Sequence, residues 1–170
     1  MKTREEILKS ASSGNKDADL KVISLGVGVQ STAMYLMSSM EYKMPRADVA
    51  IFADTGGEYQ ETLQLLDWLL KWKKENNGID IIVNREQNLL EDIFSSTNST
   101  GQRFASLPLF SESGGMIRRQ CTSEYKIQPV LKTTRKLLNL KKGQRMKPTE
   151  MWLGITTDEI QRMKKSQMYN

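Results

Sequence analysis

Four short apolar runs alternate along this chain with longer segments in which apolar residues recur every three or four positions. Runs of this length and composition are typical of buried strands, which are predicted at 21–25, 49–53, 79–83 and 149–154. Helices are predicted between and after the strands, at 30–40, 58–75, 89–94, 123–140 and from 158 onward. The alternation predicts an α/β fold: a Rossmann-like, doubly wound and mostly parallel sheet with helices on both faces.

Apolar residues define one face of each longer helix. In the helix predicted at 30–40 this stripe consists of Ala33, Met34, Leu36, Met37 and Met40. In the helix at 58–75 it consists of Leu63, Leu66, Leu69, Leu70 and Trp72. Pro129 is expected to interrupt the helix at 123–140, because proline breaks the interior of a helix. The last helix is expected to begin with Thr157 or Asp158 as its N-cap.

The length of the chain predicts one domain, at 20–170, preceded by a polar leader at 1–19 with a short helix at 4–10. Residues 95–116 form a long Ser-, Thr- and Gly-rich segment, which favours a mobile loop that faces the substrate. No apolar run approaches the ~20 residues that a bilayer-spanning helix needs, and the first residues lack the apolar core of a signal peptide. We therefore expect a cytoplasmic protein with no membrane partner.

Composition excludes several kinds of active site. The chain has no histidine, which removes Ser-His-Asp triads, Cys-His pairs and every His-containing metal site. Its one cysteine cannot form an internal disulfide or a self-contained zinc or iron–sulfur site, so no cluster is expected within this chain. A metal bound here would be a hard ion on oxygen ligands, of which Mg²⁺ bridging phosphates is the most compatible.

Polar loops follow the first two predicted strands, and parallel strands bring such loops to one crevice. The loop at 26–32 offers open backbone at Gly26 and Gly28 and hydroxyl groups at Ser31 and Thr32. A phosphate at a strand-to-helix turn needs unhindered N–H groups and the positive end of a helix. Taken alone, the loop is equally compatible with a tight turn that binds nothing. The second loop makes phosphate binding the favoured interpretation.

The second loop begins with Asp54, Thr55 and Gly56, directly after a strand that the pattern predicts to be buried. A carboxylate in that position needs a partner or a task. We expect Asp54 to accept a hydrogen bond from ribose or adenine, or to orient Mg²⁺. It also suits the N-cap of the helix that follows, and the two roles can coexist.

These two loops and two later segments form an ordered set of motifs. The loop at 26–32 is similar to a Ser-Gly-Gly-x-Asp-Ser loop, and 54–62 to an Asp-Thr-Gly-x-x-aromatic-x-Glu-Thr segment. Residues 121–129 resemble Cys-Cys-x-x-Arg-Lys-x-Glu-Pro, and 154–162 resemble Gly-x-Arg-x-x-Glu-Ser-x-x-Arg. The family that carries all four, in this order, is that of the phosphoadenosine phosphosulfate reductases and their relatives. These are PP-loop proteins of the adenine-nucleotide alpha-hydrolase superfamily.

The resemblance implies a PP-loop fold that binds an adenine nucleotide, either ATP or phosphoadenosine phosphosulfate. It places at the nucleotide Gly26, Gly28, Gln30, Ser31, Thr32, Asp54, Thr55, Gly56, Glu61, Arg118, Arg119, Lys126 and Arg162. Asp54 and Cys121 are the candidate catalytic residues.

The chain departs from the family pattern at several positions. The family's Ser, second Gly and Asp fall at Gly26, Val27 and Gln30, and the glutamine supplies no carboxylate. The family's substrate-contacting Arg falls at Thr156, which weakens sulfonucleotide binding there. The second Cys of the third motif is Thr122, and the family's C-terminal Cys-containing segment has no counterpart in this sequence.

Cys121 also has a case that rests on its neighbours. It follows Arg118 and Arg119 and precedes Lys126, and nearby cations lower the pKa of a thiol. It is therefore a candidate nucleophile or sulfur carrier, the alternative being a small buried residue. The three cations are themselves candidate ligands for phosphate or sulfate, the arginines in bidentate fashion.

Charge is distributed unevenly along the chain. The formal net charge is +5, and ten cations between 118 and 147 face a single acid, Glu124. Such a region predicts a polyanionic partner, either nucleic acid or a protein. For its distal part, 132–147, an ordinary solvated helix face and turn is the favoured alternative.

From these motifs together we expect an adenine-nucleotide-binding protein that acts on a nucleotide phosphate or sulfate. Two alternatives stay open. The first is an ATP pyrophosphatase that adenylates its substrate in nucleic-acid sulfur modification. The second is a catalytically inactive nucleotide-binding module that works through a partner, which the missing histidine, Gln30 and the missing Cys segment all favour.

Overall fold

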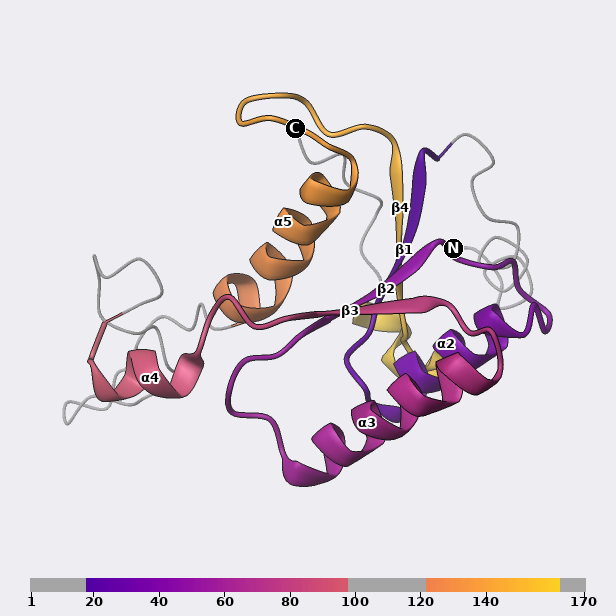
Figure 1. Cartoon of the computed structure of the whole chain (residues 1–170), viewed down its shortest axis with the longest axis horizontal. Helices are drawn as coiled ribbons and strands as arrows, with labels where there is room; N and C mark the ends of the chain where they lie inside the picture. The colour runs from indigo at the N-terminus through magenta and orange to yellow at the C-terminus, as the bar shows by residue number, and fades with distance from the viewer. Residues whose placement is uncertain (1–17, 98–121, 163–170) are drawn as a thin grey trace.

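The computed structural model describes residues 18–97 and 122–162, the side chains of 160–162 excepted. This part of the chain contains four strands and four α-helices, which are labelled in Figure 1. The strands are β1 (Leu20–Ser24), β2 (Val49–Ala53), β3 (Asp80–Asn84) and β4 (Thr149–Leu153). The helices are α2 (Val29–Ser39), α3 (Gln60–Glu75), α4 (Leu89–Phe94) and α5 (Gln128–Leu137), with a π-helical turn η1 (Thr122–Ile127) and a 3₁₀ turn η2 (Thr157–Arg162).

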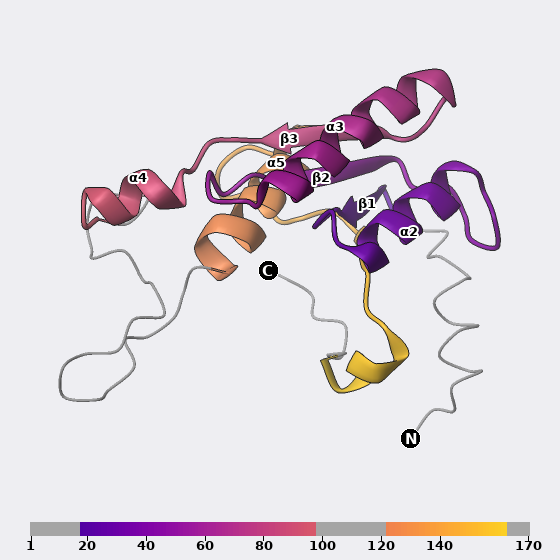
Figure 2. The same cartoon turned by 90° about the horizontal axis from the view of Figure 1, so that it is seen from below.

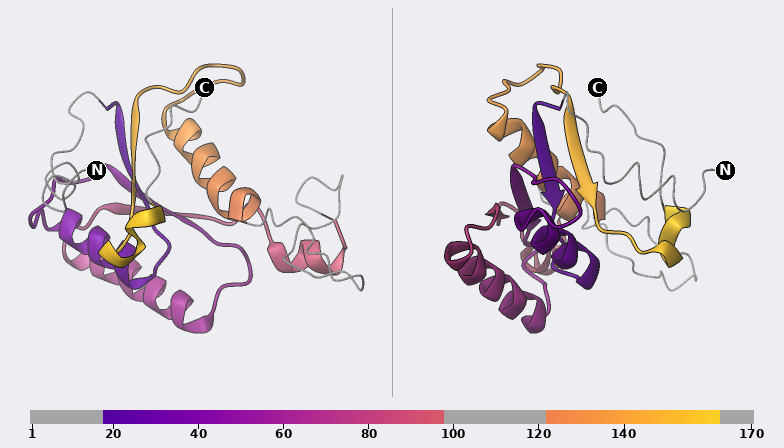
Figure 3. Two further views of the ribbon diagram at one scale, coloured as in Figure 1. Left: turned by 180° about the vertical axis from the view of Figure 1, so that it is seen from behind. Right: turned by 90° about the vertical axis from the view of Figure 1, so that its right-hand side faces the viewer.

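The four strands form one all-parallel sheet in the order β3-β2-β1-β4. The central pair is in register from Val22 opposite Val49 to Ser24 opposite Ile51. The chain therefore moves outward from β1 to β3 and then returns past its start to add β4 on the other side of β1. This is the connectivity of a Rossmann-like α/β fold, which confirms the predicted α/β class with a parallel sheet. The sheet is strongly twisted, so that β3 and β4 cross in Figures 1 and 3.

Helices cover both faces of the sheet, which explains why the central strands are apolar on both sides. On one face Tyr35 of α2 and Leu66 of α3 pack with Ile23 and Phe52 in one buried cluster. On the other face Val130 of α5 packs with a second cluster, made up of Val22, Val49, Ile51 and Ala53. Helix α4 lies apart from α2 and α3, beyond the sheet (Figure 2). No helix among the described residues is long and apolar enough to cross a bilayer.

The apolar stripe predicted for α2 is only partly right, because Met34 and Leu36 pack against the core but the most deeply buried face is a different one. Ala33 and Met40 are exposed, and the buried residues of the helix are Ser31, Tyr35, Ser38 and Ser39. The hydroxyl of Ser38 donates to the carbonyl of Pro45 at 2.9 Å and accepts the N–H of Ala47 at 2.9 Å. Because its hydroxyl bonds backbone groups in the turn before β2, Ser38 is buried without an unpaired polar atom. Apolar periodicity has no means of detecting such a face.

Two helix ends also differ from expectation. Pro129 does not interrupt a helix, because it occupies the first turn of α5, where its missing N–H costs nothing. The residues before it form the separate turn η1. The last segment is a 3₁₀ turn that is kinked at Glu159, in place of the predicted α-helix. The other elements predicted within the described residues agree with the structure to within two residues at each end, and β2 and α4 agree at both ends. The short helix predicted at 4–10 lies outside the described residues.

Replacing Tyr35 by phenylalanine should lower the free energy of unfolding by about 1–2 kcal/mol, because a buried carbonyl loses its donor. The phenol of Tyr35 donates to the carbonyl of Ile79 at 2.7 Å, and burial raises the pKa of Tyr35 above its usual value, so the proton stays in place. Urea unfolding measures the change. Tyr42→Phe, at an exposed tyrosine, is the control and should change nothing. Equal stability of the two variants would contradict the role given to this hydrogen bond.

Candidate functional site

The loops that follow β1, β2 and β4 leave the sheet at the carboxyl ends of its parallel strands. Strand order reverses at β1, where the next strand along the chain, β2, lies on one side and β4 on the other. Ligands of open α/β sheets bind in the crevice at such a reversal. The candidate site is therefore built here, from the loop 25–28, the loop 54–59 and the start of the segment that follows Leu153 (Figures 1 and 3).

The loop after β1 has an unusual backbone at Val27. Its φ of 55° lies in the left-handed region, although its side chain is β-branched. The side chain is only 4% exposed and belongs to the core cluster on the α2 and α3 face. A residue held in this region costs about 1–3 kcal/mol and persists only where its surroundings enforce it. Here the burial of Val27 enforces it, and the result is a sharp change of direction from β1 into α2.

Gly28 is the N-cap of α2 and gives the helix no side-chain cap. The first turn also lacks an acidic residue that would interact with the positive end of the helix. The first N–H groups of a helix have no intrahelical partner, and together with the helix dipole they attract an anion. An alanine Cβ at Gly28 would meet only Gln30 Oε1 at 3.8 Å, so the backbone there faces open space. This amino end is suited to bind a phosphate group.

The hydroxyl groups of the first turn of α2 differ in their bonding. Ser31 is buried, and its Oγ donates to the carbonyl of Gly28 at 3.2 Å. Oγ1 of Thr32 is buried and has no hydrogen-bond partner among the described residues. A buried hydroxyl without a partner costs about 1–3 kcal/mol. Thr32 is therefore the polar group of this turn that most needs a further partner.

Gly154, which follows β4, lies directly against the amino end of α2. A Cβ at this position would be 2.7 Å from the backbone N of Ser31 and 2.8 Å from the carbonyl carbon of Gln30. Only glycine permits this approach, because neither backbone can give way as a flexible side chain would. The first residue of the fourth motif thus contacts the first motif.

Asp54 is held by two hydrogen bonds at the end of β2. Its Oδ1 accepts the N–H of Gly56 at 3.0 Å, and its Oδ2 accepts Nε of Arg85 at 3.0 Å. The carboxylate is 13% exposed, and Arg85 is largely exposed. The alternative role as a helix cap is wrong, because α3 begins at Gln60 and its N-cap is Tyr59. Arg85 itself was not predicted from the sequence. It could have been noticed as the first cation after β3, the neighbour of β2.

The rest of this loop connects the second and third motifs. Thr55 is buried, and its hydroxyl donates to Oε1 of Glu58 at 2.9 Å. The same oxygen lies 3.3 Å from Nζ of Lys126, which comes from η1. Lys126 therefore lies beside the loop after β2, and its ammonium is engaged by Glu58 in this structure. A ligand anion would share that ammonium or displace the carboxylate.

Gly56 occupies a position that only glycine fits. Its φ is +75°, and a Cβ there would be 2.3 Å from Oδ1 of Asn88. That oxygen accepts the N–H groups of Leu90 and Glu91 and so caps α4. The loop after β2 and the start of α4 are consequently packed as one unit.

The remaining predicted site residues are not brought together by the described part of the chain. Glu61 lies on the first turn of α3 with its side chain exposed. Arg118, Arg119 and Cys121 lie outside the described residues, as does the side chain of Arg162. The proposed thiol chemistry and the arginine pair therefore stay predictions.

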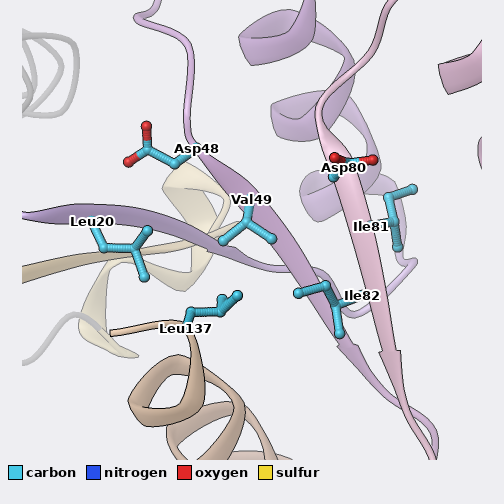
Figure 4. A pocket seen from close by; sticks show the side chains of 7 residues that line it. All are labelled: Leu20, Asp48, Val49, Asp80, Ile81, Ile82 and Leu137. Carbon is cyan, nitrogen blue, oxygen red and sulfur yellow. The ribbon is translucent and has the colours of Figure 1, made fainter. Parts of the chain in front are cut away.

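A hollow of about 360 Å³ lies at the opposite edge of the sheet (Figure 4). It is lined by Leu20, Asp48, Val49, Asp80, Ile81, Ile82 and Leu137. Leu20, Val49 and Asp80 are the first residues of β1, β2 and β3, so the hollow belongs to the amino ends of the sheet. The Lys73 ammonium, 2.8 Å away, lowers the pKa of Asp80, and Asp48 accepts the N–H of Lys21. The lining is mainly aliphatic and its charges are acidic, which does not suit a phosphate.

No protein-family model, no curated protein and no solved structure matches this chain. The class of protein that the fold defines is an α/β protein with a parallel Rossmann-like sheet.

Proposed function

We propose that this protein binds an adenine nucleotide at the carboxyl ends of β1, β2 and β4, and acts on its phosphate or sulfate group. The observation that carries the proposal is the amino end of α2. It lies where strand order reverses, it has no side-chain cap, and its N-cap residue is a glycine that faces open space. These are the properties that bind phosphates at helix amino ends.

In this proposal the phosphates accept hydrogen bonds from the N–H groups at the start of α2, and the hydroxyl of Thr32 gains its missing partner. Asp54 supplies an oxygen for ribose, adenine or Mg²⁺, because a carboxylate offers about four acceptor positions and two are in use here. Arg85 neutralises Asp54, which prevents this carboxylate from repelling the nucleotide phosphates. A bound Mg²⁺ would further reduce the repulsion between phosphates and acids.

The substrate is either ATP or a sulfonucleotide such as phosphoadenosine phosphosulfate. Titration calorimetry with ATP, AMP and phosphoadenosine phosphosulfate, each with and without Mg²⁺, tests binding and separates the two. Release of pyrophosphate from ATP would support an adenylating ATP pyrophosphatase. Binding without turnover would support a nucleotide-binding module that acts through a partner. If none of the three nucleotides binds at millimolar concentration, the proposal is wrong.

Gly28→Val should weaken nucleotide binding by at least about tenfold, which corresponds to 1.4 kcal/mol. The added methyl groups occupy the space in front of the helix amino end and keep phosphate from the backbone. The fold tolerates the change, because φ of −84° at Gly28 suits any residue and the nearest atom is a flexible side-chain oxygen. Calorimetry measures the affinity, and thermal unfolding checks the fold. Unchanged affinity in a folded variant would place the phosphates elsewhere.

A further inference from the structure

The connection from α5 to β4 carries a second concentration of positive charge, far from the candidate nucleotide site. Between 128 and 149 the chain has seven cations and no acid. Figure 1 shows this connection at the top of the molecule, with the first turn of α2 below the sheet. A ligand bound at the connection would therefore not touch the nucleotide.

The tip of the connection is an ordered turn. The N–H of Gln144 donates to the carbonyl of Lys141 at 3.2 Å, and Gly143 has the positive φ of 84° that the third position of a type II turn requires. The side chain of Gln144 closes the turn again, because its Oε1 accepts the N–H of Lys141 at 2.6 Å. Lys142 is thus held exposed at the tip of a defined turn.

Arg135 of α5 braces the turn from beneath. One of its guanidinium nitrogens donates to the carbonyl oxygens of Lys141 at 3.0 Å and Gln144 at 2.9 Å. A hollow of about 760 Å³ opens between helix and turn, lined by Arg135, Lys142, Gly143, Gln144 and Arg145. No carboxylate lines it. The side chains of Lys142 and Arg145 thus lie beside the guanidinium of Arg135, which is held by backbone carbonyl groups. The other two lining residues, Gly143 and Gln144, are uncharged.

The chemistry of this surface selects the kind of polyanion. No aromatic residue occurs between 126 and 149, so the surface offers no platform on which unpaired bases would stack. A protein that binds through cations alone contacts phosphates and is insensitive to sequence. The charge density of phosphates is highest on a duplex. Lys136 of α5 differs from these cations, because it pairs with Glu86 in the segment after β3 and its charge is already compensated.

We propose that the hollow formed by α5 and the turn 141–144 binds the phosphate backbone of a double-stranded nucleic acid. Arg135 positions the turn, and Lys142 and Arg145 contact the phosphates. The interaction is independent of nucleotide binding at the other edge of the sheet. Duplex DNA and duplex RNA present the same chemistry, and the experiment below includes both.

Fluorescence anisotropy with short labelled DNA and RNA duplexes tests this proposal on the full chain. The double variant Lys142→Glu, Arg145→Glu should weaken binding at least about tenfold and reduce the steepness of the salt dependence by about two units in log–log form, because two phosphate contacts are lost. The matched control is Lys71→Glu, Lys74→Glu, which makes the same change in net charge at exposed positions on α3. Its affinity should stay within about threefold of the unaltered protein at moderate salt, where screening limits the effect of distant charges.

Several outcomes would overturn the proposal. These are absence of duplex binding by the unaltered protein, equal losses in the two double variants, tighter binding to a single strand of the same length, and equal binding to anionic phospholipid vesicles. Gly28→Val separates this proposal from the previous one, because it should leave duplex affinity unchanged. Circular dichroism confirms that each variant is folded. A preference for RNA or for DNA identifies the source of the duplex.

Discussion

Replacing Gly154 by alanine is expected to weaken nucleotide binding by at least about tenfold and to lower the free energy of unfolding by about 1–3 kcal/mol. The new methyl group would be 2.7 Å from the backbone N of Ser31, so either the end of β4 or the start of α2 must move. A shift of the helix start displaces the N–H groups that are proposed to bind phosphate. Both effects therefore have one cause.

Calorimetry with the preferred nucleotide and urea unfolding measure the two effects. Gly26→Ala is the control for stability, since its Cβ would meet nothing closer than Ser31 Oγ at 3.8 Å. A Gly154→Ala protein that is destabilised but binds nucleotide normally would show that the phosphates do not depend on the start of α2. A variant with unchanged stability would contradict the close packing itself.

Replacing Gly56 by alanine is expected to lower the free energy of unfolding by about 2–3 kcal/mol. Of this, about 1–2 kcal/mol comes from placing a Cβ at a φ of +75°. About 1 kcal/mol more is expected from the loss of the α4 cap, because Oδ1 of Asn88 would be 2.3 Å from the new methyl group and must leave its position.

The neighbouring glycine provides the control for this second substitution. A Cβ at Gly57 would meet only Leu90, at 3.6 Å from its Cγ, which is an ordinary contact. Gly57→Ala should therefore change stability by less than about 0.5 kcal/mol. Urea unfolding of both variants gives the difference. Equal stabilities would mean that the loop after β2 relaxes around residue 56 without strain.

The strands and the order of the elements were predictable from the sequence for a simple reason. Central strands of a parallel sheet are buried on both faces, so they form continuous apolar runs such as Val49–Ala53, whose ends were predicted correctly. The helix α2 was predicted with the wrong face, because its buried side is made of serines and a tyrosine whose partners lie in other segments. The spacing of apolar residues predicts the buried face of a helix only where the buried side chains are themselves apolar.

The candidate site was predictable as two loops but not as a set of contacts. Glycines after strands indicated where backbone would be open, and this fits Gly28 but not Gly56, which is packed against Asn88. The pairing of Asp54 with Arg85, and of Glu58 with Lys126, depends on which strands are neighbours and how far along the sheet each loop begins. The sequence contains many lysines and arginines, so charge alone could not identify which of them pairs with Asp54 or Glu58. Likewise, the charge of the basic segment 132–147 did not predict the ordered turn that this segment forms after α5.

The buried side chain of Val27 affects the entropy of any ligand that binds beside it. If glycine occupied position 27, the loop would sample many conformations. It would lose this conformational entropy when a phosphate bound. With Val27 fixed in the core at a φ of 55°, that freedom is already lost when the protein folds. The strain of about 1–3 kcal/mol is then carried by the stability of the domain, and binding does not have to order the loop. The loop after β1 is in this sense preorganised.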